Sequence, residues 1–290
     1  MRLCRFGNGR LGVVNGDMVQ DVTAALDALP SYRHPLPRHD VVIEHLDALR
    51  PRILEIAAAA PSRPLAGVSL LSPVANPGKL VAAPVNYQKH LDEVRANPDI
   101  HHHRPIATIQ NAGLFLKATS SVVGAGEGIA LRKLDRRSDH EVELAIVIGR
   151  RAGGVARADA LACVAGYCIG LDITIRGPEE RSLRKSVDSY SVLGPWLVSA
   201  DEIENPGNLD VRLSVNGEAR QQSNTRDLIL SVPELIEFAS SFYTLHPGDV
   251  IFTGTPEGVG PIQPGDRITA SIEGIGTMQV AVRAADLVDS

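Results

Sequence analysis

The feature that most constrains the fold of this chain is a succession of short apolar segments from Leu80 to the C-terminus. Each segment ends at Gly, Pro, Asn or Asp, residues that favour turns, and several are rich in Val and Ile, which favour strands. One helix is expected among them, at Pro233 to Leu245, with Ser231 as its N-cap. The pattern predicts a β-rich α+β fold, closer to a folded sheet roll or sandwich than to a doubly wound sheet.

The sequence divides into a small α/β module over residues 1–70 and a main domain over residues 76–290. In the first part, two short alternating runs joined by Asn15-Gly16 predict a β-hairpin. The Leu, Ile and Ala spacing from Val41 to Ala60 predicts a helix, which Pro51 should kink or split. A Pro-rich stretch then leads into the main domain.

Glycines at positions 7, 9 and 12 spell the pattern G-x-G-x-x-G, which also occurs in dinucleotide sites. Such a site requires a strand before the glycines and a helix that begins on them. The residues that follow, GVVNGDMV, have the pattern of a strand and a hairpin. The glycines therefore indicate a turn and not a nucleotide site.

Composition and charge exclude several classes of partner. The 290 residues carry a formal net charge of -5 and contain no run of Lys or Arg that could follow a phosphate backbone, so we expect no nucleic acid partner. No apolar run approaches the roughly 20 residues that cross a bilayer, and the N-terminus lacks the apolar core of a signal peptide, so we expect no membrane. Cys4, Cys163 and Cys168 form no disulfide framework. This favours the reducing cytoplasm.

Two predicted strands carry acidic side chains, and the two glutamates of the first strand share one of its faces. In DHEVELAIVIG, alternation places Glu141 and Glu143 on one face of the strand, with their Cα atoms about 6.6 Å apart, and apolar side chains on the opposite face. In VAGYCIGLDIT, Asp172 lies on a face otherwise made of small residues, where a ligand can approach the backbone. An isolated Glu-x-Glu pair is more often a solvated strand face. If the three carboxylates converge, however, they need a cation, and oxygen ligands select Mg²⁺, Mn²⁺ or Ca²⁺ over zinc.

A third cluster lies in the segment NYQKHLDEV. On a helix, His90 and Glu93 are neighbours at i and i+3, so the carboxylate can orient the imidazole to take a proton from water. The alternative is an ordinary surface ion pair. His101, His102 and His103 follow nearby, but adjacent residues point in different directions, which disfavours a metal site there.

Six motifs in this order and spacing resemble the fumarylacetoacetate hydrolase family, over the chain from about Leu80 to the C-terminus. They are NYxxHxxE, FLK followed by SSVVGAGEGI, DHEVELAIVIGRRA, VAGYCIGLDITIR, KSVDSYSVLGPWLV and LHPGDVIFTGTPEGVG. The resemblance implies a mixed β-sandwich roll for the catalytic domain, preceded by the variable N-terminal module, and a homodimer.

The resemblance also implies the roles of individual residues. Its conserved acidic pattern corresponds to one Mg²⁺ or Mn²⁺ per subunit, held by Glu141, Glu143 and Asp172. The water-activating dyad corresponds to His90 and Glu93. Substrate contacts correspond to Lys185, which is also catalytic, and to Arg176, Thr253 and Thr255.

One stretch departs from the family pattern. Many relatives have Asp-x-Gln after the arginine, whereas this chain has Gly177-Pro178-Glu179. An ionised Glu only accepts hydrogen bonds, so Glu179 in the substrate site would repel a carboxylate unless Arg176, Arg181 or Arg184 neutralises the region. The departure concerns the distal end of the substrate and not the metal chemistry.

The leading functional hypothesis is metal-dependent hydrolysis of the carbon-carbon bond of an acylpyruvate, a 2,4-dioxo acid. Maleylpyruvate or fumarylpyruvate, products of aromatic ring cleavage, is the preferred small-molecule substrate, giving pyruvate and maleate or fumarate. One alternative is an isomerase, tautomerase or decarboxylase of a related 2-oxo acid that uses the same metal enolate. Another is a non-catalytic β-rich binding protein.

Overall fold

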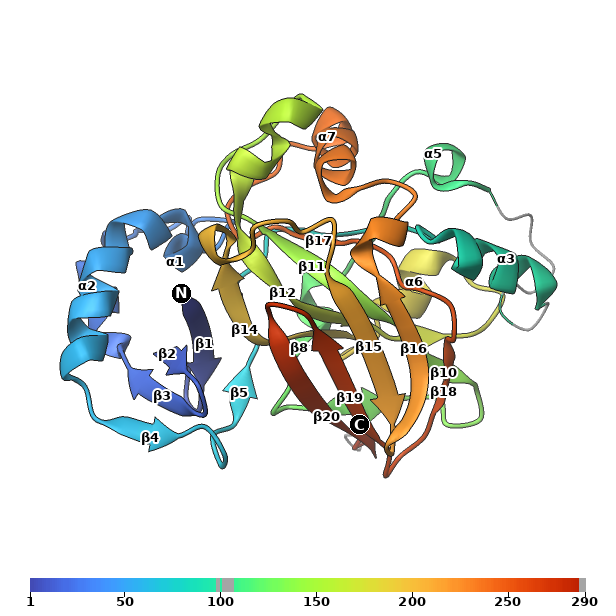
Figure 1. Ribbon diagram of the computed structural model, residues 1–290, viewed down its shortest axis with the longest axis horizontal. Helices are drawn as coiled ribbons and strands as arrows, with labels where there is room; N and C mark the ends of the chain where they lie inside the picture. Colours follow the sequence, from blue (N-terminus) through green and yellow to red (C-terminus); the bar gives the residue numbers. More distant parts are fainter. Residues whose placement is uncertain (98–99, 101–106, 287–290) are drawn as a thin grey trace.

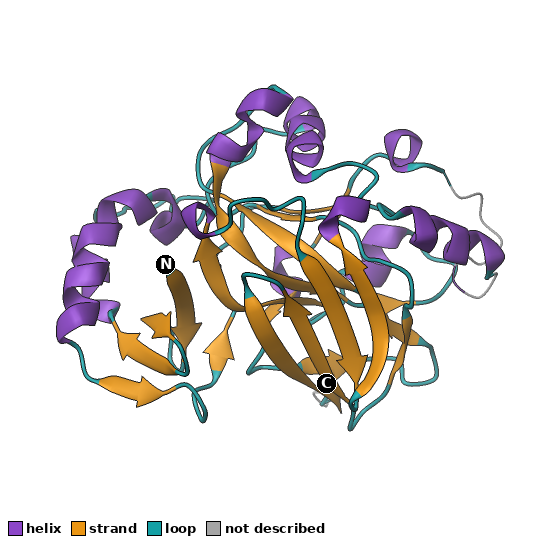
Figure 2. Ribbon diagram, viewed as in Figure 1, coloured by secondary structure: helices purple, strands orange, loops and turns teal. Residues whose placement is uncertain are grey.

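The computed structural model describes residues 1–97, 100 and 107–286, and its strands form three sheets (Figure 2). The largest is a 12-stranded mixed sheet. Its strands in spatial order are β4 (Ser62–Pro64), β3 (Met18–Asp21), β2 (Arg10–Asn15), β1 (Arg2–Phe6), β14 (Ser191–Ser199), β12 (Val164–Asp172), β11 (Val142–Ile148), β17 (Val250–Phe252), β6 (Leu80–Ala82) and β7 (Phe115–Lys117), with β5 (Leu70–Leu71) on β1 and β8 (Val122–Gly124) on β14.

Two smaller sheets complete the main domain (Figure 1). The five-stranded sheet has the order β16 (Glu218–Asn224), β15 (Asp210–Val215), β19 (Arg267–Ile272), β20 (Gly276–Ala284) and β9 (Ile129–Leu131). The three-stranded sheet has the order β13 (Thr174–Ile175), β10 (Ser138–His140) and β18 (Gly260–Ile262). The prediction of a β-rich α+β fold with a mixed sheet is confirmed.

The helices are few and mostly short. They are α1 (Val41–Glu44), α2 (Leu46–Ala59), α3 (Gln88–Ala96), α5 (Ile109–Ala112), α6 (Arg181–Lys185) and α7 (Val232–Phe242), with 3₁₀ turns η1 (Thr23–Ala28), η2 (Thr119–Ser121), η3 (Arg157–Cys163), η4 (Ala200–Glu202) and η5 (Thr225–Asp227). Among the described residues, none of these helices is long and apolar enough to span a bilayer.

Alternation along β11 sends its side chains into two different cores. Val142, Leu144 and Ile146 belong to the core shared with the five-stranded sheet, as the apolar opposite face of this strand predicts. The opposite face of β11 carries Glu143 near its start and then Ala145 and Val147. These two residues are also buried, in a core that includes residues of α1 and α2. The central strands are therefore covered on both faces, which fixes their register firmly.

The N-terminal part continues the main sheet. Strand β1 pairs antiparallel with β14, where Leu3 lies opposite Leu197. The predicted hairpin is present, but its turn lies one residue later than predicted. Asn15 ends β2 and pairs with Met18, so the turn residues are Gly16, which has a positive φ of 60°, and Asp17. The division into residues 1–70 and 76–290 stays a prediction. In the structure, strands from both sides of this boundary belong to one sheet.

Gly7 and Gly9 lie at the connection between β1 and β2, as the turn interpretation predicts, whereas Gly12 does not. Gly7 and Gly9 have positive φ values of 54° and 81° in the turn itself. Gly12 lies inside β2, where an added Cβ would come within 2.7 Å of Val19. These glycines serve chain reversal and close strand packing.

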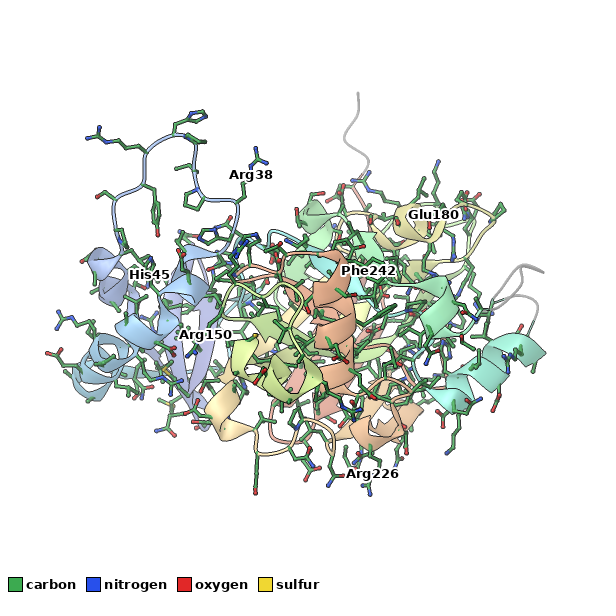
Figure 3. The ribbon with its side chains drawn as sticks, turned by 90° about the horizontal axis from the view of Figure 1, so that it is seen from above. Arg38, His45, Arg150, Glu180, Arg226 and Phe242 are labelled. Atoms are coloured by element: carbon green, nitrogen blue, oxygen red, sulfur yellow. The ribbon has the colours of Figure 1, made fainter. Side chains whose placement is uncertain are left out.

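Two helix boundaries differ from the predicted ones. The helix expected over 41–60 divides at His45 (Figure 3) and not at Pro51, which lies inside α2. Because α2 begins at Leu46, Pro51 is its sixth residue and removes a single backbone hydrogen bond in the second turn, and the helix continues. The second helix, α7, begins at the predicted cap Ser231 but ends at Phe242, because Leu245 pairs instead with Ala152.

Candidate metal centre and active site

The three acidic residues converge at the ends of β11 and β12. Glu143 lies opposite Gly170 in the antiparallel pair, and the Asp172 N–H donates to the Glu141 carbonyl over 2.9 Å. Glu141, Glu143 and Asp172 are 5%, 2% and 1% exposed, and one carboxylate oxygen of each lies within 4.8 Å of the others. The solvated-face alternative for Glu141 and Glu143 is thereby excluded.

Two buried lysines contact this acidic cluster. Lys185 Nζ lies 2.7 Å from Glu141 Oε2 and 2.5 Å from Asp172 Oδ2. Lys117 pairs with the other Asp172 oxygen and donates to the Tyr190 carbonyl over 2.9 Å. Lys185 was predicted for the site, whereas Lys117 was not. The signal available for it was a lysine that ends the otherwise apolar strand FLK.

The carboxyl groups differ in how their ionised forms are supported. Burial opposes ionisation of Glu141, but Lys185 and Arg176 outweigh it and lower its pKa to about 2. Burial raises the pKa of Glu143 well above its ordinary value, and the nearby charge of Asp172 raises it further. The backbone N–H of Gly254 donates to Glu143 Oε2 over 2.6 Å, which only partly offsets this.

These features fit a divalent cation. Three buried carboxylates supply oxygen donors, the ligands that Mg²⁺ and Mn²⁺ prefer. Burial and the neighbouring charge of Asp172 raise the pKa of Glu143, so a bound cation would favour its ionised form. A divalent cation would supply further positive charge, and Glu141, Glu143 and Asp172 are the side chains that could hold it.

The predicted dyad lies on α3. His90 Nδ1 and Glu93 Oε2 are 2.7 Å apart, and His90 is buried and lines the same cavity as the acidic cluster. Glu93 Oε1 accepts a hydrogen bond from the Gly258 N–H over 3.0 Å, which ties the helix to the loop after β17. His90 therefore has a fixed orientation. The histidines at 101–103 lie outside the described residues.

Arg176 is turned toward carboxylates of the protein. Its Nε lies 2.8 Å from Asp139 Oδ2, and its Nη2 lies 3.1 Å from Glu141 Oε1. Arg137 also donates two hydrogen bonds to Asp139, from Nε to Oδ1 over 2.6 Å and from Nη2 to Oδ2 over 2.9 Å. Arg176 thus lines the cavity and also contacts Glu141, one of the three carboxylates that could hold a cation, and its predicted substrate contact stays a prediction.

The two predicted threonines have different positions. Thr255 lines the cavity, where its hydroxyl donates to the Val142 carbonyl and accepts from Gln221. Thr253 is fully buried outside the cavity lining, and its hydroxyl donates to the Leu144 carbonyl over 2.9 Å. Thr253 therefore fixes β17 against β11, and the expected substrate contact does not arise from this position.

Glu179 also differs from its expected place. Arg136 holds its carboxylate with two hydrogen bonds of 2.8 and 2.7 Å, and Glu179 is not among the residues that line the cavity. The side-chain hydrogen bonds to Arg136 lower the pKa of Glu179, so it stays ionised. The repulsion of a substrate carboxylate that its sequence position suggested is thereby removed.

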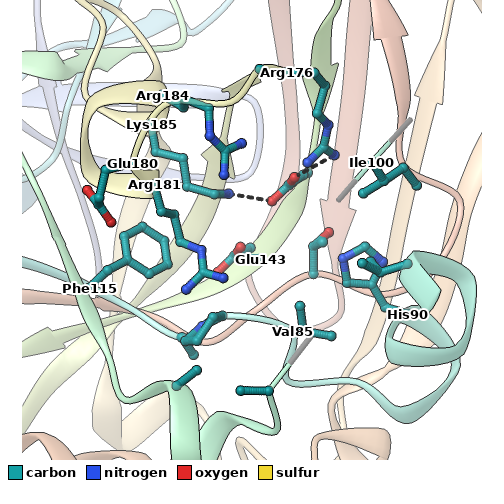
Figure 4. A pocket seen from close by; sticks show the side chains of 18 residues that line it. Val85, His90, Ile100, Phe115, Glu143, Arg176, Glu180, Arg181, Arg184 and Lys185 are labelled. Atoms are coloured by element: carbon teal, nitrogen blue, oxygen red, sulfur yellow. Dashed lines mark hydrogen bonds and ion pairs between the residues drawn. The ribbon is translucent and has the colours of Figure 1, made fainter. Parts of the chain in front are cut away.

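The cavity in front of these groups has a volume of about 300 Å³ (Figure 4). Acidic and basic side chains form one part of its wall, and aliphatic side chains of α3 and the segment before it form another. The lining includes Val85, His90, Val94, Ile100, Phe115, Glu141, Glu143, Arg176, Arg181, Arg184, Lys185 and Thr255.

Comparison with known proteins places these residues in a family context. The family model described as "Fumarylacetoacetate (FAA) hydrolase C-terminal" matches residues 79–283. The chain is 63% identical over 286 residues to maleylpyruvate hydrolase of Aquipseudomonas alcaligenes, covering 98% of this chain and 100% of that protein. It is 34% identical over 235 residues to the mitochondrial oxaloacetate tautomerase of Rattus norvegicus, covering 77% of this chain and 72% of that one.

A solved structure extends the similarity to the whole fold. It is maleylpyruvate hydrolase from Sphingobium sp. SYK-6 in complex with manganese (II) ion and pyruvate. That protein is 41% identical to this chain, the match covers 99% of this chain and 100% of the other, and the TM-score is 0.84. The similarity therefore includes the N-terminal part as well as the main domain.

Proposed function

Because this chain belongs to the fumarylacetoacetate hydrolase family, we propose that it is a metal-dependent hydrolase that cleaves the carbon-carbon bond of an acylpyruvate. Maleylpyruvate is the preferred substrate, with fumarylpyruvate as its geometric isomer, and the reaction belongs to the degradation of aromatic compounds. Two relatives with matches over nearly the whole chain are maleylpyruvate hydrolases. The observation that carries the proposal is the convergence of the acidic triad, Lys185 and the His90–Glu93 dyad around one cavity.

Glu141, Glu143 and Asp172 would hold the cation. When bound, Mg²⁺ or Mn²⁺ acts as a Lewis acid toward the 2-oxo acid end of the substrate and stabilises the negative charge that develops there. Thr174 and Arg176 donate to Glu141, at 3.0 and 3.1 Å, and so fix the orientation of that ligand.

His90 is the general base of the proposed reaction. Glu93 accepts from Nδ1, which leaves Nε2 as the nitrogen that takes a proton from water. The resulting hydroxide adds to the C4 carbonyl. The C3–C4 bond then breaks, its electron pair stays on C3, and the proton held by His90 returns to C3. The products are maleate and pyruvate, with the oxygen of the water in the new carboxylate of maleate.

Lys185 supplies a fixed positive charge beside the reacting oxygens. Burial opposes the charged form, but Asp172 and Glu141 outweigh it and raise the pKa of Lys185. The side chain lines the cavity, so its ammonium group is placed to stabilise an oxyanion as water adds.

A tautomerase of a related 2-oxo acid is the second candidate, since the rat relative is an oxaloacetate tautomerase. The two functions separate in one assay. The Mn²⁺-loaded protein is incubated with maleylpyruvate, and pyruvate and maleate are measured together with keto-enol exchange. Equal amounts of both products support hydrolysis. Accelerated exchange without either product contradicts it and supports the tautomerase.

We further propose a cytoplasmic homodimer. The family resemblance supports the dimer, and the three free cysteines, two of them buried, suit a reducing compartment. Light scattering at several concentrations measures the assembly, and a mass of one chain at all of them contradicts the dimer.

A further inference from the structure

The short helix α6 turns three cationic side chains toward the cavity (Figure 4). Residues three and four positions apart share a helix face, so Arg181, Arg184 and Lys185 lie on one side. Leu183, on the other side, is 59% exposed. Of these cations, Lys185 contacts the metal ligands Glu141 and Asp172 directly.

The two arginines are oriented by contacts away from the metal ligands. The guanidinium carbon of Arg181 lies 5.4 Å from the centroid of the Phe115 ring. Arg184 Nε donates to the Glu179 carbonyl over 3.0 Å. A guanidinium presents five N–H donors in a rigid fork that matches a carboxylate. Arg181 and Arg184 line the cavity together with Lys185, Glu141 and Glu143.

The charge of the cavity lining favours a ligand with more than one negative charge. Among the described residues, four lining cations face three lining carboxylates, and Asp172 behind them is paired with Lys117. With all three carboxylates ionised and a divalent cation bound, the described part of the lining would carry a net charge of +3. The 2-oxo acid end of a substrate brings one carboxylate to the metal, which leaves positive charge for a second.

The position of Glu179 keeps this part of the cavity positive. Arg136 holds the Glu179 carboxylate outside the cavity lining. Glu180 does line the cavity, and its carboxylate accepts a hydrogen bond from the Ser182 N–H at the start of α6. Val85, Val94 and Phe115 offer an apolar wall to the carbon chain of a substrate. At about 300 Å³, the volume is at the small end of ligand cavities, which suits a short dicarboxylic acid.

We propose that Arg181 and Arg184 bind the distal carboxylate of the acylpyruvate and select dicarboxylic substrates over those with a neutral acyl group. This inference rests on the proposed function and names the residues that decide its substrate class. Arg181 and Arg184 lie on the helix that also carries Lys185, so one element positions both the charge at the metal end and the receptor for the distal end.

The test compares two substrates on the same variants. Maleylpyruvate has the distal carboxylate, whereas acetylpyruvate has the same 2,4-dioxo acid head with a methyl group. In Arg181→Met and Arg184→Met, we expect kcat/KM for maleylpyruvate to fall about 10- to 100-fold, the effect of losing a charged hydrogen bond. The kcat/KM for acetylpyruvate should change less than about 3-fold, which also shows that the variants fold.

The matched control is Arg132→Met, which removes an exposed arginine that pairs with Asp188 outside the cavity lining. It should leave kcat/KM for both substrates unchanged. An equal fall in kcat/KM for both substrates in the Arg181 and Arg184 variants overturns the proposal, because the arginines then act on the 2,4-dioxo acid part that both substrates share. Unchanged kcat/KM for maleylpyruvate overturns it as well.

Binding of the products tests the proposed arginine site for the distal carboxylate without turnover. With Mn²⁺ present, calorimetry should show maleate binding weakened about 10-fold or more in the Arg181 and Arg184 variants, with pyruvate binding unchanged. Unchanged maleate binding, or an equal loss for pyruvate, contradicts the receptor even if the wild type hydrolyses neither substrate. Failure of the wild type to release pyruvate contradicts the proposed function instead.

Discussion

Replacing Arg176 with methionine tests whether this residue mainly supports the metal ligand. The guanidinium is 8% exposed and joins Asp139, at 2.8 Å, to Glu141, at 3.1 Å. Methionine keeps the length of the side chain but removes both ion pairs. The substitution should therefore act on stability and on metal affinity together.

The expected loss of stability depends on the ion pairs that Asp139 and Glu141 keep in the variant. Removing one partner of a buried ion pair costs about 3–5 kcal/mol when it leaves the other charge uncompensated. Here Asp139 keeps Arg137, and Glu141 keeps Lys185, so we expect a smaller loss of about 2–3 kcal/mol. At about 2–4 °C per kcal/mol for a chain of this class, the Tm should fall by about 4–12 °C. Loss of a side chain that orients a metal ligand should weaken Mn²⁺ binding about 10- to 100-fold.

The assay measures thermal unfolding in EDTA at one fixed protein concentration, and Mn²⁺ affinity by calorimetry. Arg137→Met is the control, because Arg137 is 31% exposed and pairs with Asp139, whereas the arginine that pairs with Glu141 is Arg176. Its effect on Mn²⁺ affinity should be small. A Tm within about 1 °C of the wild type and normal Mn²⁺ affinity, with only KM raised, would refute the reasoning and make Arg176 a substrate contact.

Four further predictions concern the dyad, the triad and the loop after β17. His90→Ala should lower kcat for pyruvate release about 10²-fold or more with Mn²⁺ binding unchanged, and weaker Mn²⁺ binding would contradict its assignment as the base. Because burial and Asp172 raise the pKa of Glu143, Mn²⁺ must displace a proton there, and calorimetry in two buffers at neutral pH should detect its release. For the same reason, the metal-free protein should lose stability as pH rises from about 4.5 through the raised pKa, since the folded state holds the extra proton, whereas Glu143→Gln should lack this dependence. Gly258→Ala should lower both Tm and kcat, because φ is +91°, the added Cβ would lie 2.0 Å from the Arg220 carbonyl oxygen, and the Gly258 N–H anchors Glu93; a wild-type melting curve and rate would contradict this.

Much of the site follows from local sequence periodicity. Alternation predicts that Glu141 and Glu143 share a face of one strand and that Asp172 lies on a small-residue face of another. The antiparallel pairing of β11 and β12 then brings the three together. Helical spacing likewise predicts the contact between His90 and Glu93. In each case the partners lie on one element or on strands that pair directly.

The rest depends on contacts between residues far apart in the sequence. Lys117 meets Asp172 across 55 residues, and Arg136 meets Glu179 across 43 residues, so no local pattern indicates either pair. The pairing of β1 with β14 is also long-range, and it is why the sheet extends into residues that the sequence assigns to a separate module. Periodicity reports which face a side chain occupies, whereas the identity of its partner depends on the tertiary fold.

The most direct test of the central claim is the fate of the water oxygen. The Mn²⁺-loaded protein is given maleylpyruvate in ¹⁸O-labelled water, and the products are analysed by mass spectrometry, with a Glu141→Ala variant as the metal-site control. If His90 activates water for attack at C4, each maleate carries one ¹⁸O in its new carboxylate, pyruvate forms in equal amount, and the variant forms neither. Carbon dioxide, or an isomerised substrate without maleate, would contradict hydrolysis of the carbon-carbon bond.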